Sequence, residues 1–214
     1  MDDELALASA LDLADLTTFM SRAATLGCEH VRLSAHGNAL VVSVGVLTRA
    51  SLLDTTPIVL GVRVFELATP SSLDRVILVR ALADRLAHGE QTLPVPPAVP
   101  GVSWSGVAPP SGGWEPAGRI SEAELESIAR EGIAEVAGVS GKGTLIVTRV
   151  RTEVWSRMRH LAGIDVAAGV AFAAYGLGFL APDASSSPEP PVANVSRSSN
   201  WTRFSTPRGH VILR

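Results

Sequence analysis

The sequence is poor in cysteine and in lysine, and both shortages limit what the protein can be. Cys28 is the only cysteine in the 214 residues, so no intrachain disulfide and no thiolate metal cluster within one chain is possible. The single lysine, Lys142, stands against 17 arginines, a usage typical of a high-GC genome. The opening Met1-Asp2-Asp3-Glu4 lacks the basic residues of a secretory signal. These features predict a bacterial, soluble, cytoplasmic protein.

Recognisable catalytic and nucleotide-binding motifs are also missing. There is no Gly-x-Ser-x-Gly elbow, His-Glu-x-x-His helix or Gly-x-Gly-x-x-Gly loop. Gly141-Lys142-Gly143-Thr144 resembles a phosphate loop, but Val136 stands where that loop needs glycine and Gly143 where it needs serine or threonine. No two of the five histidines have the spacing that places two imidazoles on one helical face. We expect no metal and no cofactor, and an enzyme is not favoured.

Charge is scarce and unevenly distributed. Residues 1–141 carry 17 acidic and 9 basic side chains, net −8, whereas residues 142–214 carry 4 acidic and 9 basic ones, net +5. Mutual attraction of the two halves is the simpler interpretation, and a basic surface for an acidic partner is the alternative. The overall net charge of −3 makes nucleic acid an unexpected partner and membrane surfaces an unexpected location.

The pattern over residues 1–91 predicts an α-β-β-β-α unit. A helix is expected over Ser9–Gly27, capped by Ser9 and stopped by Gly27. The runs Val31–Ala35 and Leu40–Leu47, separated by a Gly-Asn centre, predict a β-hairpin. Ile58–Leu67 adds a third strand, and Leu73–His88 reads as a second helix capped within Thr69–Ser72.

Residues 92–118 contain seven prolines and five glycines and predict a stiff connecting segment. Because this segment carries Trp104 and Trp114, we expect it to lie against a domain.

The remaining part, residues 119–214, is expected to be mainly helical. Ser121 and Glu124 form a capping box for a helix to about Val136. Further patterns predict a helix over Thr144–Leu161, with a strand at 145–150 as the alternative, a buried helix over Ile164–Ala181, a flexible loop over Asp183–Pro191 and a hairpin of Trp201–Ser205 with His210–Leu213. Eighteen residues with three glycines favour a core helix over a membrane-associated segment at 164–181.

Together these elements predict an α+β protein: a small antiparallel sheet flanked by helices, and a mainly helical C-terminal half closed by a β-hairpin. The expected domains are 1–91, the connecting segment 92–118, and 119–214, with the two larger parts packed as one globule.

Arginine and aromatic side chains of the C-terminal part are the leading candidate binding residues. They are Arg151, Trp155, Trp201, Arg203 and His210. Exposed aromatics and arginines are preferred at interfaces, so we expect a non-catalytic binding or regulatory protein with a protein partner or a second copy of itself. Burial of both Trp104 and Trp201 would remove this support.

The alternative is a small-molecule enzyme or ligand-binding protein with a pocket between the two halves. Its candidate residues are Cys28, His30, His36, Arg151, Trp155, Arg203 and His210. A nucleic-acid binder is a third possibility, because arginines beside Trp155 and Trp201 can serve phosphates and stacked bases.

Several stretches are similar to uncharacterised proteins of high-GC Gram-positive bacteria. They are Gly113-Trp114-Glu115-Pro116, Gly132-Ile133-Ala134-Glu135-Val136, Arg151-Thr152-Glu153-Val154-Trp155, and the run from Trp201 to His210. The resemblance implies a bacterial cytoplasmic protein and assigns no activity or site residue.

Overall fold

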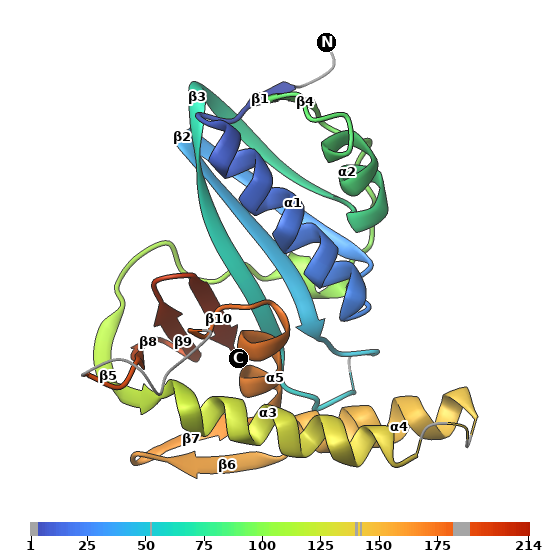
Figure 1. Cartoon of the computed structure of the whole chain (residues 1–214), viewed down its shortest axis with the longest axis vertical. Coiled ribbons are helices and arrows are strands. Elements are labelled where there is room, and N and C mark those ends of the chain that lie inside the picture. Colours follow the sequence, from blue (N-terminus) through green and yellow to red (C-terminus); the bar gives the residue numbers. More distant parts are fainter. Residues whose placement is uncertain (1–3, 52, 140, 142, 182–188) are drawn as a thin grey trace. The chain divides into compact units, whose positions relative to one another are not determined.

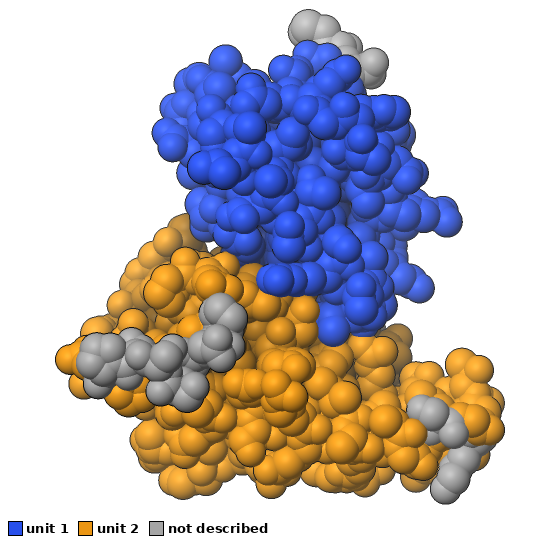
Figure 2. All heavy atoms as spheres, in the orientation of Figure 1, with its two compact units in different colours: residues 1–45, 62–107 blue, residues 46–61, 108–214 orange. Residues whose placement is uncertain are grey.

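The computed structural model describes the chain except for residues 1–3, 52, 140, 142 and 182–188. The chain divides into two compact units (Figure 2). Unit 1 comprises residues 1–45 and 62–107, and unit 2 comprises residues 46–61 and 108–214. The fold is α+β with antiparallel strand pairs, as the sequence predicted.

The helices and strands follow one another along the chain as shown in Figure 1. In order they are β1 (Glu4–Ala6), α1 (Ala10–Thr25), β2 (His30–Leu47), β3 (Val59–Leu78), α2 (Val79–Leu86), β4 (Thr92–Pro94), the 3-10 turn η1 (Ser103–Gly106), β5 (Glu115–Ser121), α3 (Glu122–Ala137), α4 (Thr144–Ser156), β6 (Met158–Leu161), β7 (Ile164–Ala167), α5 (Ala168–Gly176), β8 (Val192–Ser198), β9 (Trp201–Thr206) and β10 (Gly209–Leu213).

The first helix begins and ends where its sequence signals lie. Ser9 Oγ accepts a hydrogen bond from the Asp12 backbone N–H at 3.1 Å, and Gly27 takes a positive φ of 81° just beyond the helix. Phe19 and Met20 on its buried face are at most 1% exposed. The prediction of this helix is confirmed, and within unit 1 it packs against α2.

The two runs of the predicted hairpin, 31–35 and 40–47, form one continuous element, β2, whose sheet neighbour is β3. Figure 1 shows β2 changing direction sharply along its length. Gly37 has φ of 62° in the middle of the strand, and Asn38 Nδ2 donates to the Leu67 carbonyl at 2.8 Å. Residues 36–39 are exposed between the buried Ala35 and Leu40, so the Gly-Asn signal marks the point where the chain turns, as the sequence predicted.

The predicted helix over residues 73–88 is wrong in its first part, since strand β3 continues to Leu78. Val76 and Ile77 favour a strand, and Arg32 Nη2 pairs with Asp74 Oδ2 at 2.6 Å across β2 and β3. Pairing with β2 outweighs the helical spacing of the apolar residues, and the helix begins only at Val79.

Six strands form one sheet in the order β2-β3-β10-β9-β8-β5. The end of β2 and the start of β3 belong to unit 2. Ile58 and Arg214 exchange two backbone hydrogen bonds of 3.0 Å, which fix the start of β3 to the end of β10. The predicted C-terminal hairpin is confirmed as β9 and β10, with Thr206 paired to Gly209. The sequence patterns did not predict β5, β6, β7 or β8, so this part holds more strand than expected.

The helices of unit 2 also differ in detail from the patterns. α3 begins after Ser121 as predicted, but the Ser121 side chain makes no cap hydrogen bond, and the Glu122 N–H donates instead to the Pro191 carbonyl at 3.0 Å. The helix predicted to reach Leu161 ends at Ser156, where β6 follows, and the segment 164–181 is a strand followed by the short buried helix α5. The greater part of the predicted loop over 183–191 lies outside the described residues.

None of the described helices is long and apolar enough to cross a membrane.

One glycine of α3 permits the close approach of α4. A Cβ atom at Gly132 would collide with the ring of Trp155, which stacks on Phe172 with centroids 4.2 Å apart and is 2% exposed. We expect Gly132→Ala to lower the free energy of unfolding by about 1–3 kcal/mol, the usual cost of overpacking. Urea unfolding measures the difference. Gly112→Ala is the matched control, since nothing lies within 4 Å of its Cβ position. Equal stability of the two variants would contradict the packing.

Candidate functional site

A row of polar side chains crosses four strands of unit 2. Arg119 of β5 pairs with Asn194 of β8, Asn194 pairs with Ser205 of β9, and Ser205 pairs with His210 of β10. Along β8 the neighbours Ala193 and Val195 are buried, whereas Asn194 is exposed. Because side chains alternate along a strand, the polar row and the buried residues occupy opposite faces of the sheet.

A second row lies beside the first, with Pro116, Ser196 and Arg203 in register. The β5–β8 pairing shifts between Pro116 and Gly118, which places a β-bulge at the edge of this face. Gly118 has φ of 145°, and a Cβ there would lie 3.1 Å from Ile164 Cδ1. Bulges re-aim side chains, and this one precedes Arg119 directly.

The guanidinium of Arg203 lies over the ring of Trp114, 4.5 Å from its centroid. Trp114 is oriented by its indole N–H, which donates to the Pro110 carbonyl at 3.1 Å. Arg203 Nε is buried, and no hydrogen-bond acceptor reaches it among the described residues. Loss of hydration lowers the pKa of Arg203 from its ordinary value. This cation is thus held in a fixed place with one donor unused.

His210 is linked to the same group of residues. Its Nδ1 lies 2.9 Å from Ser205 Oγ. Burial lowers the pKa of His210, and the charge of Arg203 lowers it further. The histidine is therefore neutral near pH 7 and adds no positive charge to the two arginines.

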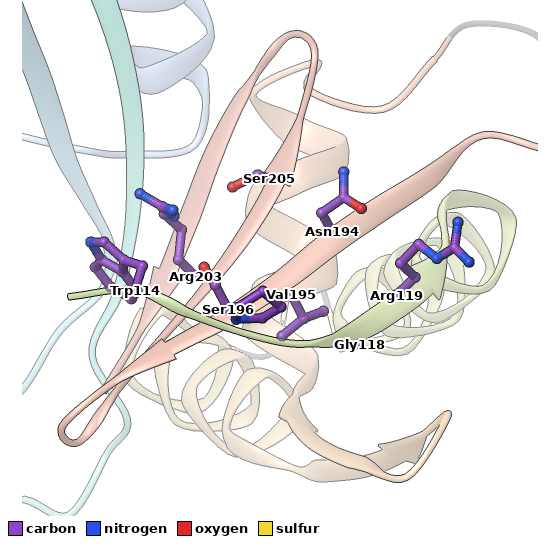
Figure 3. A pocket seen from close by; sticks show the side chains of 9 residues that line it. Trp114, Gly118, Arg119, Asn194, Val195, Ser196, Arg203 and Ser205 are labelled. Carbon is purple, nitrogen blue, oxygen red and sulfur yellow. The ribbon is translucent and has the colours of Figure 1, made fainter. Parts of the chain in front are cut away.

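These side chains line a groove of about 640 Å³ (Figure 3). The lining residues are Trp114, Pro116, Gly118, Arg119, Asn194, Val195, Ser196, Arg203 and Ser205. Within the described part of the chain this lining holds two arginines and no carboxylate. The groove offers guanidinium, amide and hydroxyl donors on one surface, which is the chemistry that binds anions.

Ser205 of the groove lining and His210 have the geometry of a nucleophile and its base. In the described residues no carboxylate or carbonyl is recorded on the second ring nitrogen of His210, as an orienting group would be. The same portion of the chain contains no group of three or more His, Cys, Asp or Glu that could hold a metal ion.

Of the residues singled out from the sequence, Arg203 lines this groove, and His210 contacts Ser205 of the lining. Trp201 is 4% exposed and Trp104 is 8% exposed, so the argument from exposed tryptophans for a protein-binding surface fails. Trp201 lies beneath the guanidinium of Arg214, 5.4 Å from its ring centroid.

The other candidates are not among the residues that line the groove. Trp155 stacks on Phe172, and the Arg151 guanidinium lies 5.5 Å from the centroid of the same ring. Cys28, His30 and His36 belong to unit 1, where Cys28 is 6% exposed and His36 Nε2 lies 3.1 Å from Ser34 Oγ.

Sequence reasoning missed the other aromatic and polar side chains of the groove. They are Trp114, Arg119, Asn194, Ser196 and Ser205. The alternation of small apolar and polar residues from Ala193 to Ser196 is a strand signal that could have found two of them.

The charge of Arg203 can be tested through the titration of His210. We expect Arg203→Gln to raise the pKa of His210, because a neighbouring positive charge is removed, while burial still keeps it below 6.5. NMR titration of the imidazole ring protons measures the shift. Arg208→Gln, which changes an exposed arginine in the β9–β10 turn, should leave the pKa unchanged. An unmoved His210 pKa in the Arg203 variant would contradict the arrangement.

The lowered pKa of His210 predicts how the free energy of unfolding depends on pH. A histidine whose pKa is lower in the folded than in the unfolded state makes the protein lose stability as pH falls through about 6.5, since the unfolded chain takes up the proton first. We expect His210→Gln to flatten this part of the profile. Urea unfolding between neutral and mildly acidic pH measures it, and parallel profiles of the two proteins would count against a depressed pKa.

Comparisons with known proteins agree with the division of the chain and add no activity. Residues 1–106 match Domain of unknown function (DUF8010), and residues 109–214 match Domain of unknown function (DUF8185). A search of curated proteins finds no match.

Among solved structures, the chain is similar to a putative DNA polymerase III beta subunit from Eubacterium rectale. The TM-score is 0.53 at 9% sequence identity, and the match covers 99% of this chain but only 64% of that protein. At this identity the likeness shows the fold alone. The chain thus belongs to uncharacterised proteins that combine a DUF8010 domain with a DUF8185 domain, neither of which has an assigned function.

Proposed function

We propose that this chain is a non-catalytic binding protein whose unit 2 holds an anionic group of its ligand in the groove around Arg203. The observation that carries the proposal is the buried, unpaired Nε of Arg203 in a groove whose described lining has no carboxylate. A buried donor without a partner costs free energy, and a bound acceptor would recover it.

Arginine suits this role because of its shape. The planar guanidinium presents N–H groups in a fixed fork that matches a carboxylate or phosphate with two parallel hydrogen bonds. Stacking on Trp114 fixes the plane of the Arg203 fork before any ligand arrives. Arg119, an exposed arginine two strands away, supplies a second cation.

A binding role is also consistent with the comparisons. The similar structure is described as a putative DNA polymerase III beta subunit, and both domain families lack an assigned reaction. The proposed setting is the cytoplasm of a high-GC Gram-positive bacterium, which rests on the single cysteine and the excess of arginine over lysine. We further propose that the ligand belongs to a partner protein or to a second copy of this chain.

Hydrolysis at Ser205 is the competing function, favoured by the 2.9 Å contact with His210. The lowered pKa keeps His210 neutral, as a general base requires. We expect no turnover of p-nitrophenyl acetate or p-nitrophenyl phosphate above the buffer rate. Turnover that is lost in Ser205→Ala would establish an enzyme and contradict the proposal.

Anion binding is tested by thermal unfolding in citrate or inorganic phosphate, against chloride at the same ionic strength. Ligand at ten times its Kd stabilises the native state by about 1.4 kcal/mol, which raises Tm by roughly 3–6 °C. We expect this rise in the unaltered chain and in Arg208→Gln, and its loss in Arg203→Gln.

Circular dichroism and Tm without added anion show whether each variant folds. If Arg203→Gln is unstable, Arg203→Lys, which keeps the positive charge, is measured in its place. A rise of Tm that is the same in Arg203→Gln and in the unaltered chain would contradict the proposed function.

A further inference from the structure

The ligand class can be narrowed from the form of the groove, if the proposed anion site is accepted. Four of its nine lining residues, Pro116, Gly118, Arg119 and Asn194, are exposed. Sites for small molecules are concave and largely enclosed. A groove that lies open on a sheet is instead suited to a segment of a macromolecule.

The two cations are set well apart. Arg119 belongs to β5 and Arg203 to β9, with β8 between them. Neighbouring strands lie about 4.8 Å apart, so the two backbones are separated by roughly 10 Å across the sheet. Figure 3 shows the two side chains at separate positions along the groove. The occupant therefore presents two separate anionic groups, at a spacing spanned by about three residues of extended peptide.

Neutral polar groups fill the space between the cations. Asn194 and Ser196 both belong to β8, and their side chains line the groove between Arg119 and Arg203. An amide and a hydroxyl can each donate and accept hydrogen bonds, as the backbone C=O and N–H groups of an extended peptide require. Their placement matches a main chain between two acidic side chains.

The groove is less suited to nucleic acid. Single-stranded nucleic acid is bound by aromatic rings on which successive bases stack. Trp114 is the only aromatic side chain in the described lining, and the guanidinium of Arg203 already covers one face of its ring. The chain as a whole is negatively charged, which opposes general attraction to a phosphate backbone.

We infer that the groove binds an extended acidic peptide segment of a partner protein, with one carboxylate on Arg203, another on Arg119, and the intervening main chain on Asn194 and Ser196. The inference rests on the proposed function and specifies its ligand. It also agrees with the excess of basic residues in the C-terminal part of the sequence.

The test uses the full chain and short capped peptides with two glutamates separated by one, two or three serines. Peptides with glutamine in place of glutamate are the controls, and isothermal titration calorimetry measures binding. We expect the glutamate peptides with the longer spacing to bind more tightly than the glutamine peptides by about tenfold or more, from two charge-assisted contacts.

Single substitutions of Arg203 and Arg119 measure the two carboxylate contacts separately. Arg203→Gln should weaken the glutamate peptide by about tenfold or more, and Arg119→Gln should weaken it by a smaller factor because that arginine is more exposed. Arg203→Lys should recover only part of the affinity, since lysine keeps the charge but loses the planar fork. Arg208→Gln should leave the affinity unchanged.

Two other probes distinguish the ways in which this inference can fail. If an oligo-dT of about twelve nucleotides binds more tightly than every peptide and depends on Arg203, the peptide inference is overturned while the anion site stands. If peptides, oligo-dT and inorganic phosphate all bind without dependence on Arg203, the inference and the proposed function both fail.

Discussion

The partly dehydrated charge of Arg203 is the constraint on which this account depends. A guanidinium is normally solvated on all sides, yet here one face lies on Trp114 and Nε is buried without an acceptor. Binding of an anion therefore removes less water from this guanidinium than from an exposed one, because the guanidinium is already partly dehydrated in the unliganded protein. The same charge depresses the pKa of His210. The groove favours a negatively charged ligand, because the described residues that line it include no carboxylate to neutralise the arginines.

One face of the sheet in unit 2 is buried in the core, and the other face carries the polar side chains of the groove. Ala193 and Phe204 are buried, at 0% and 2% exposure, while their neighbours Asn194 and Ser205 line the groove. A one-residue shift in strand pairing would exchange these two faces, so the register that builds the core also positions the site. The bulge beside Gly118 adds a local adjustment that carries Arg119 onto the polar face.

Much of the local structure could be predicted from the sequence, because the responsible signals are local. Ser9 and Gly27 bound α1, and the turn between β9 and β10 is encoded by its own residues. Predictions failed where pairing with distant residues decides the outcome, as at residues 73–78, which join β3. Arg203 and His210 were found as candidates by residue type alone. Trp114 and Arg119 could not be found, because they reach the groove only through the pairing of β5 with β8 and a hydrogen bond to Pro110. Burial of Trp104 and Trp201 was likewise invisible, since burial depends on the completed fold.

The most direct test of the central claim observes the Nε–H proton of Arg203 by ¹⁵N NMR, assigned by its loss in Arg203→Lys. This account predicts a signal in the unliganded chain that shifts downfield and exchanges more slowly with water as a glutamate peptide or phosphate is added, because the proton gains an acceptor. The Nε–H signal of Arg208 should not move. If the Arg203 signal stays unchanged at saturating anion, the groove around Arg203 is not the binding site.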